Sequence, residues 1–214
     1  GRVYLRDNDS IGLPVAAVAL GYQYPDGTSI GGQVIGRGRY IARHLTGLDQ
    51  ETGRGSQALE WTLGAEGVEV EVNLRDGSYR VLKAACAMDV GKVVNPELAR
   101  GQIVGALAMA LGFASREGFQ FDERGRVVNG NLRDFKLFRY GEEPEYFVDF
   151  LETPQGDGPY GLRGLGEQGV IGVPAALANA LSRAIGVELY ELPLTPERLW
   201  RSLHDKELYR GAIQ

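Results

Sequence analysis

A strand pair followed by a long helix limits the folds open to this chain. In the segment VEVEV, Val68, Val70 and Val72 alternate with Glu69 and Glu71, which is typical of a strand with one exposed face. The segment RDGS supplies a turn, and a second apolar run follows it. The sequence therefore predicts a β-hairpin over residues 68–91.

The segment after this hairpin is predicted to be a long helix. Asn95 is a good N-cap residue, and Pro96 suits the first helical position. Apolar side chains then recur at helical spacing and form one stripe: Ile103, Leu107, Leu111 and Ala114. Short strands are predicted in GRVVN and EYFVDFLE, and helices in VPAALANALSRAIG and LTPERLWRSL. This order predicts an α+β fold in which helices pack on a mixed sheet.

Residues 1–60 carry weaker signals. The segment PVAAVALGYQYPDGTSIGG suggests one strand that ends in a Pro-Asp-Gly turn, and GGQVIGRGRY and TGLDQETGRGSQ have the composition of loops. This part holds too little apolar surface to form a core alone. We therefore expect a loop-rich segment over residues 1–60 that packs on the same domain, and a C-terminal domain over residues 61–214.

Composition excludes several kinds of function. The net charge of −5 gives no electrostatic reason to expect nucleic acid or an anionic membrane as a partner, and the apolar runs are interrupted short of membrane-spanning length. Cys86 is the only cysteine, and His44 and His204 do not stand in a metal-ligand spacing. Redox centres would therefore belong to a cofactor or another chain, and a cytoplasmic location is expected.

A glycine-rich turn, GPYGLRGLGEQGVIGVP, surrounds one acid, Glu167. Gly164, Gly166 and Gly169 spell the dinucleotide fingerprint G-x-G-x-x-G, but that motif requires a strand that ends at the first glycine, and the nearest predicted strand ends near Glu152. We therefore reject a nucleotide-binding domain. On residue chemistry alone, Glu167 caps the following helix, lies exposed, or is a partly buried base with a raised pKa.

Three ordered blocks resemble one family. The blocks are AMDVGKVVNPELARGQIVGALAMALG, NGNLRDFKL, and GLRGLGEQGVIGVPAALANALSRAIG followed by ELPLTPERLWRSL. Together they resemble the C-terminal part of the molybdopterin-binding large subunit of the molybdenum hydroxylases, the xanthine dehydrogenase, aldehyde oxidase and carbon monoxide dehydrogenase family. The resemblance implies that residues 61–214 form the C-terminal molybdopterin-binding domain of a molybdenum-dependent oxidoreductase.

The resemblance also implies roles for three residues. Glu167 matches the catalytic glutamate beside the molybdenum, which acts as a general base. Gln102 matches a glutamine that hydrogen-bonds the pterin cofactor, and Gly166 would lie against the same site. The pterin dithiolene holds the metal in this family, so no side chain of this chain is expected to be a metal ligand.

Partners and cofactors follow from the same resemblance. We expect the molybdenum-pterin cofactor in the assembled enzyme but not in the isolated chain, and 2Fe–2S and FAD groups on partner chains. The remaining part of the molybdopterin subunit would complete the site for a small-molecule substrate, and the isolated chain is expected to be inactive and oligomeric. The substrate stays open, because GEQG differs from the GEPP of xanthine dehydrogenase and aldehyde oxidase.

Two apolar residues leave a second interpretation open. The family often has Gln where Met109 stands and Glu where Val104 stands. These changes remove part of the polar contact set for the pterin. The alternative is a non-catalytic structural or assembly module that retains the fold.

Five other residues have simpler interpretations. Asp89 is predicted to be a turn or cap residue, and Cys86 a small core residue. Arg163 either pairs with an anionic group of a ligand or is a solvated loop cation. Trp61 and Trp200 are predicted to be packing residues.

Overall fold

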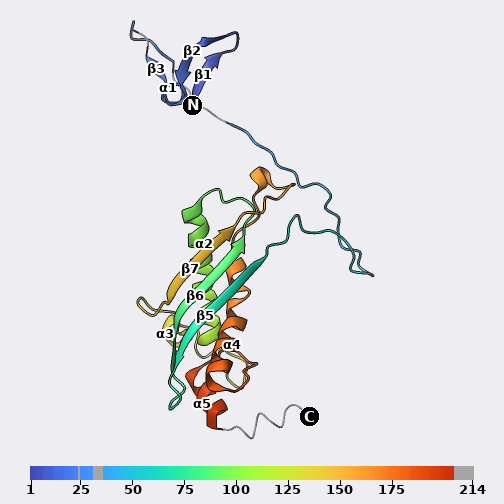
Figure 1. Ribbon diagram of the computed structural model, residues 1–214, viewed down its shortest axis with the longest axis vertical. Coiled ribbons are helices and arrows are strands. Elements are labelled where there is room, and N and C mark those ends of the chain that lie inside the picture. The colour runs from blue at the N-terminus through green and yellow to red at the C-terminus, as the bar shows by residue number, and fades with distance from the viewer. Residues whose placement is uncertain (24, 31–35, 205–214) are drawn as a thin grey trace. The chain divides into compact units, whose positions relative to one another are not determined.

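The chain divides into two compact units, Gly1–Ile41 and Ala42–Gln214, in a computed structural model that describes residues 1–23, 25–30 and 36–204 (Figure 1). The sequence predicts a boundary near residue 60, whereas the structure divides the chain at Ile41. The predicted packing of residues 1–60 on the larger domain stays a prediction. Part of the predicted loop GGQVIGRGRY, residues 31–35, lies outside the described residues, as do residues 205–214 of the predicted C-terminal domain.

The first unit has more regular structure than the sequence predicts. Strands β1 (Arg2–Leu5) and β2 (Asn8–Pro14) form an antiparallel hairpin, and β3 (Tyr22–Gln23) pairs with β4 (Ser29–Ile30). The segment VAAVAL forms helix α1 (Val15–Leu20), so the predicted strand at this point is wrong. No residue in the described part of this unit is buried, which agrees with the prediction that it lacks a core of its own.

The second unit is built on a three-stranded mixed sheet. Strand β5 (Gly64–Val72) pairs antiparallel with β6 (Tyr79–Asp89), as the predicted hairpin requires, and β6 pairs parallel with β7 (Glu145–Leu151). The sheet and its helices confirm the predicted α+β fold. The predicted strand in GRVVN is reduced to a single bridge between Phe121 and Val127.

Two helices cover one face of this sheet. Helix α2 (Pro96–Ser115) begins where predicted, and the Asn95 side chain accepts a hydrogen bond from the Leu98 backbone N–H at 3.0 Å. Helix α4 (Val173–Ile185) ends at Gly186, which has a φ of 69°. Figure 1 shows both helices behind the strands. Because β6 and β7 are parallel and α2 lies between them in the chain, β6, α2 and β7 form a β–α–β connection.

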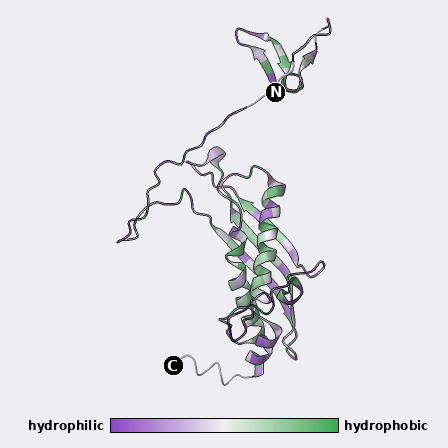
Figure 2. Ribbon diagram, turned by 180° about the vertical axis from the view of Figure 1, so that it is seen from behind, coloured by the Kyte–Doolittle hydropathy of each residue, from purple (hydrophilic) through white to green (hydrophobic). Residues whose placement is uncertain are grey.

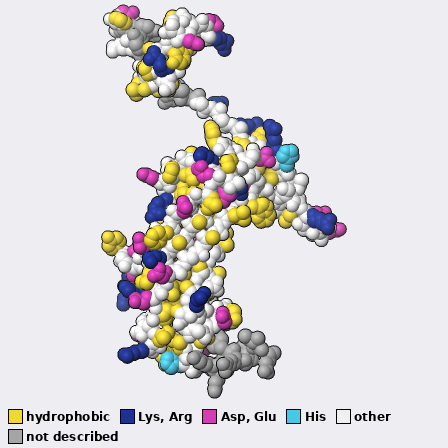
Figure 3. Space-filling view, viewed as in Figure 1, with side chains coloured by type: hydrophobic (Ala, Val, Ile, Leu, Met, Phe, Trp, Pro, Cys, Tyr) yellow, Lys and Arg dark blue, Asp and Glu magenta, His cyan; other side chains and the backbone are white. Residues whose placement is uncertain are grey.

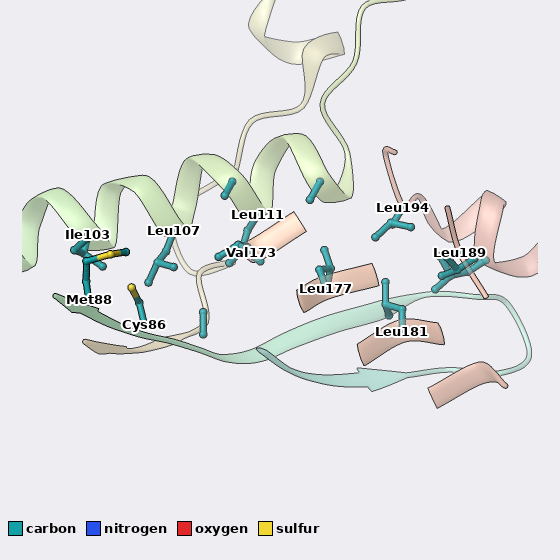
Figure 4. Close-up of a cluster of buried hydrophobic side chains, with 14 of the residues drawn as sticks. Cys86, Met88, Ile103, Leu107, Leu111, Val173, Leu177, Leu181, Leu189 and Leu194 are labelled. Atoms are coloured by element: carbon teal, nitrogen blue, oxygen red, sulfur yellow. The ribbon is translucent and has the colours of Figure 1, made fainter. Parts of the chain in front are cut away.

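The core lies between these helices and the sheet. Figure 4 shows apolar side chains of α2 and α4 pointing toward one another and toward β6, and the predicted stripe on α2 is fully buried. Figure 2 shows the alternation of hydrophobic and hydrophilic residues along these elements. The remaining elements are α3 (Leu132–Phe135), the 3₁₀ turns η1 (Pro159–Gly161) and η2 (Gln168–Val170), and α5 (Pro196–His204).

Helix α2 is long and apolar enough to cross a membrane by length and composition alone, with a mean hydropathy of 1.3. This departs from the expectation that the apolar runs are interrupted short of membrane-spanning length. The burial of Ile103, Leu107 and Leu111 in the core shows that α2 is the central helix of the second unit.

The other face of the sheet is open. Small residues occupy its centre, where Ala65 pairs with Ala87 and Gly67 pairs with Ala85. The neighbouring strand β7 adds Phe147, which is 46% exposed. Figure 3 shows hydrophobic side chains along this face. We call the surface formed by the outward residues of β5, β6 and β7 the open sheet face.

Candidate functional site

The candidate site begins with a close approach between η2 and α2. Gly169 is buried, and a Cβ added to it would lie 3.2 Å from the Ala106 Cβ and 3.4 Å from the Ile103 carbonyl oxygen. Since real Cβ atoms rarely come this close to their neighbours, only glycine fits this contact without a shift. The close approach holds the glycine-rich turn against the middle of α2.

This contact brings the predicted site residues to neighbouring segments. Gln102 precedes Ile103 on α2, and Glu167 stands two residues before Gly169. Both side chains are exposed. The described part of the chain gives neither side chain a hydrogen bond or an ion pair. Both side chains are therefore available to a group that is not part of the described structure.

The turn around Glu167 is braced by the next residue. The Gly166 N–H donates to Gln168 Oε1, and Gln168 Nε2 donates to the Gly164 carbonyl oxygen at 3.0 Å. A Cβ added at Gly166 would meet only Gln168 Oε1, at 4.0 Å. The hydrogen bonds of Gln168 thus stabilise the turn without using the Glu167 carboxylate, and space is left beside Gly166.

Of the interpretations of Glu167 made from the residues alone, the structure supports the exposed one. Glu167 precedes η2 but makes no side-chain capping hydrogen bond, and Gly172 precedes α4. The interpretation as a partly buried carboxylate does not hold within the described residues, where the Glu167 side chain is exposed. The dinucleotide interpretation also fails, since β7 ends at Leu151 and the described residues between it and Gly164 contain no strand.

Arg163 is neither a solvated cation nor a free partner for an anion. Its side chain is only 12% exposed, and its Nε lies 3.8 Å from Asp89 Oδ1. Its guanidinium also donates to the carbonyl oxygens of Trp61 and Thr153. Arg163 therefore fixes the start of the glycine-rich turn to the end of β6.

Asp89 organises the same region, as its predicted turn role requires. Its Oδ1 accepts hydrogen bonds from the Gly91 N–H at 3.0 Å and the Thr153 N–H at 3.2 Å. The Gly91 N–H is the main reason that the pKa of Asp89 lies below its usual value, and the Arg163 charge adds to it. A charged Asp89 thus holds three segments together beside the site.

Cys86 is a buried core residue, as predicted, and burial raises the pKa of its thiol to about 11. Trp61 is 80% exposed, so it is not a packing residue within the described structure. Trp200 is 43% exposed, and its ring stacks on that of His204 with 4.4 Å between the ring centres, which agrees with its predicted packing role. Glu66 is a residue of this region that was not predicted from the sequence. Its carboxylate lies against Gly172, where an added Cβ would be 2.8 Å from Glu66 Oε2. Burial raises the pKa of Glu66, and the N–H groups of Gly172 and Val173 partly offset this effect. The sequence signal that could have identified Glu66 is an acid at an inward-facing position of a strand in which apolar and polar residues alternate.

Two curated relatives resemble most of this chain. The chain is 34% identical over 150 residues to the 6-hydroxypseudooxynicotine dehydrogenase complex subunit gamma of Paenarthrobacter nicotinovorans, which covers 68% of this chain and 19% of that protein. It is also 34% identical over 146 residues to the aldehyde oxidoreductase molybdenum-binding subunit PaoC of Escherichia coli, which covers 67% of this chain and 20% of that one. The chain thus spans about a fifth of the length of these relatives.

The fold and a family profile agree with these relatives. The aldehyde oxidoreductase from Desulfovibrio gigas superposes on 75% of this chain and 17% of its own chain, with a TM-score of 0.69 and 29% identity. The profile of the molybdopterin cofactor-binding domain matches residues 1–144, which include Gln102. The match covers more than half of the sequence, and so the chain belongs to the molybdopterin cofactor-binding domain family of the molybdenum-dependent oxidoreductases.

Proposed function

We propose that this chain forms one wall of the cofactor site of a molybdenum-dependent oxidoreductase and contributes its catalytic base, Glu167. The observation that carries the proposal is the close contact of Gly169 with Ile103 and Ala106, which brings the Glu167 turn against the helix that bears Gln102. The relatives named as a dehydrogenase complex subunit and as a molybdenum-binding subunit support the same conclusion.

The residues present fit a bound molybdenum-pterin cofactor. The Gln102 amide can donate to and accept from a polar ring, and no described residue competes for it. Space beside Gly166 lets the backbone approach such a group closely. When bound, the cofactor would supply two-electron redox chemistry, which no side chain of this chain provides.

Glu167 would act in proton transfer. Its exposed carboxylate, supported by the Gln168 brace, can accept a proton from an oxygen nucleophile beside the cofactor. The rigid turn limits the positions that the carboxylate can take, which favours one geometry for the transfer. The rest of the molybdopterin subunit would complete the site, and partner chains would carry the 2Fe–2S and FAD groups.

Two substitutions in the assembled complex separate a chemical role from a binding role. Glu167→Gln keeps the shape and removes the base, so turnover per molybdenum atom should fall about 10²- to 10⁴-fold with unchanged molybdenum content. Gln102→Ala should instead lower the molybdenum content, because a pterin hydrogen bond is lost. Elemental analysis and steady-state rates measure the two effects.

The matched control is Glu123→Gln, which removes an exposed carboxylate from the turn at residues 122–126 and should change neither quantity. Normal turnover per metal in Glu167→Gln would show that this carboxylate is not the base. If neither variant changed rate or metal content, the structural-module interpretation suggested by Val104 and Met109 would replace the proposal.

A further inference from the structure

A basic depression lies at the end of the second unit opposite to the start of α2. It lies between α3, the C-terminal end of α2 and the start of β7, and it has a volume of about 850 Å³. This size is in the range of small-molecule sites. Figure 1 shows α3 and the start of β7 side by side at this end. We call it the α3 depression.

Positive charge dominates its lining. Five cationic side chains line it against two carboxylates: Arg80, Arg116, Arg133, Lys136 and Arg139 against Glu142 and Glu143. Two of the cations have partners, since Arg80 pairs with Glu71 and Arg116 pairs with Glu142, each at 2.7 Å. The depression therefore carries an excess of positive charge that its own acids do not neutralise.

Arg116 forms a fixed part of the wall. Its guanidinium lies 4.2 Å from the centre of the Phe138 ring while it pairs with Glu142. Leu137 adds a second apolar side chain to the lining. A ligand would thus meet an apolar wall as well as charge.

Three cations remain, and one of them, Arg139, acts on Glu142, whose pKa its charge helps to lower. The described structure gives the side chains of the other two, Arg133 and Lys136, no ion pair and no hydrogen bond. Their backbone positions are fixed, because Asn131 Oδ1 accepts from the Asp134 N–H at 3.1 Å and the Lys136 N–H donates to the Leu132 carbonyl oxygen at 3.3 Å. Two unpaired positive charges match the charge of a phosphate monoester near pH 7. Guanidinium and ammonium groups are also the usual protein ligands of phosphate.

We propose that the α3 depression binds a nucleotide-sized phosphate ester, with the phosphate held by Arg133 and Lys136 and the organic part against Leu137. This site is separate from the candidate cofactor site. Gln102 lies fourteen residues before Arg116, which is about 21 Å along a helix at 1.5 Å per residue.

The test is calorimetric titration of the full 214-residue chain with ADP, inorganic phosphate and adenosine. We expect saturable binding of ADP, weaker binding of inorganic phosphate, and none of adenosine. Added salt should weaken the binding, because its charged part is exposed. Arg133→Gln/Lys136→Gln should weaken ADP binding at least tenfold, which is about the loss of one charge-assisted hydrogen bond.

The control is Arg124→Gln, which removes a cation outside the depression and should leave ADP binding unchanged. In NMR spectra of the wild-type chain, the chemical-shift changes caused by ADP should centre on residues 132–139. This measurement tests the site even if the double variant fails to fold. The proposal is overturned if the wild-type chain binds neither ADP nor phosphate, or if the double variant binds ADP like the wild type. Binding of a polyglutamate peptide in their place would also overturn it and identify the depression as a protein-binding surface.

Discussion

Gly169 sets the spacing between the glycine-rich turn and α2. Gly169→Val would push side-chain carbons into Ala106 and the Ile103 carbonyl group, so we expect a loss of about 1–3 kcal/mol in the free energy of unfolding. Chemical denaturation measures it. The control is Gly105→Ala on α2, where no atom lies within 4 Å of the added Cβ. This substitution should be neutral or slightly stabilising. Equal stability of Gly169→Val and wild type would show that the contact is not tight.

Asp89 gives a pH-dependent contribution to stability. Because its pKa is lower in the folded chain, its contribution is present above the usual aspartate value of about 3.9 and is lost as the pH falls through the lowered pKa. Asp89→Asn should therefore reduce stability at pH 7, and its difference from wild type should shrink below about pH 4. Urea unfolding at pH 7 and pH 3 measures this, with Glu123→Gln as the control. A difference that does not change with pH would exclude the charge as its source.

Residue-level prediction from the sequence worked where a signal was local. The turn role of Asp89 and the burial of Cys86 follow from their immediate neighbours. Arg163 was misjudged because its partners, Asp89 and Trp61, are far away in sequence. Roles of Glu167, Gln102 and Gly166 came from the resemblance and stay predictions, since exposure alone does not establish catalysis.

At the level of elements, α2 carries the core of the second unit. Leu107→Ala should lower the free energy of unfolding by about 2–5 kcal/mol, because it opens a cavity at a fully buried position. Met109→Ala on the same helix should change it by less than about 0.5 kcal/mol, since Met109 is 49% exposed. Denaturant unfolding compares the two. Similar losses in both variants would contradict the burial pattern of α2.

Elements with a cap and a regular apolar period were predictable. Asn95, Pro96 and Gly186 mark the ends of α2 and α4 in the sequence as they do in the structure. The segment VAAVAL was predicted incorrectly, because a short apolar run fits a helix or a strand and only distant contacts decide between them. The segment GRVVN keeps only the bridge between Phe121 and Val127. The parallel pairing of β6 with β7 likewise has no local signal.

At the scale of the whole molecule, the open sheet face predicts self-association of the isolated chain. Phe147 and Leu151 are 46% and 53% exposed on this face, and burying such a surface against a second copy is favourable. Light scattering across a wide concentration range should show a dimer or larger species. Phe147→Asp should reduce it, whereas Tyr140→Asp, which removes a fully exposed aromatic side chain from a loop, should not. A monomer at all concentrations would contradict the prediction.

The parallel pairing of β6 with β7 also has a consequence for folding kinetics. The β5–β6 hairpin joins neighbouring residues and can form early, but Lys83 pairs with Glu145 only after the whole of α2 and α3 lies between them. Closing such a long loop is slow compared with forming a hairpin. During synthesis, β6 therefore waits with an unpaired edge until β7 has left the ribosome, and that interval is when the chain is most exposed to aggregation.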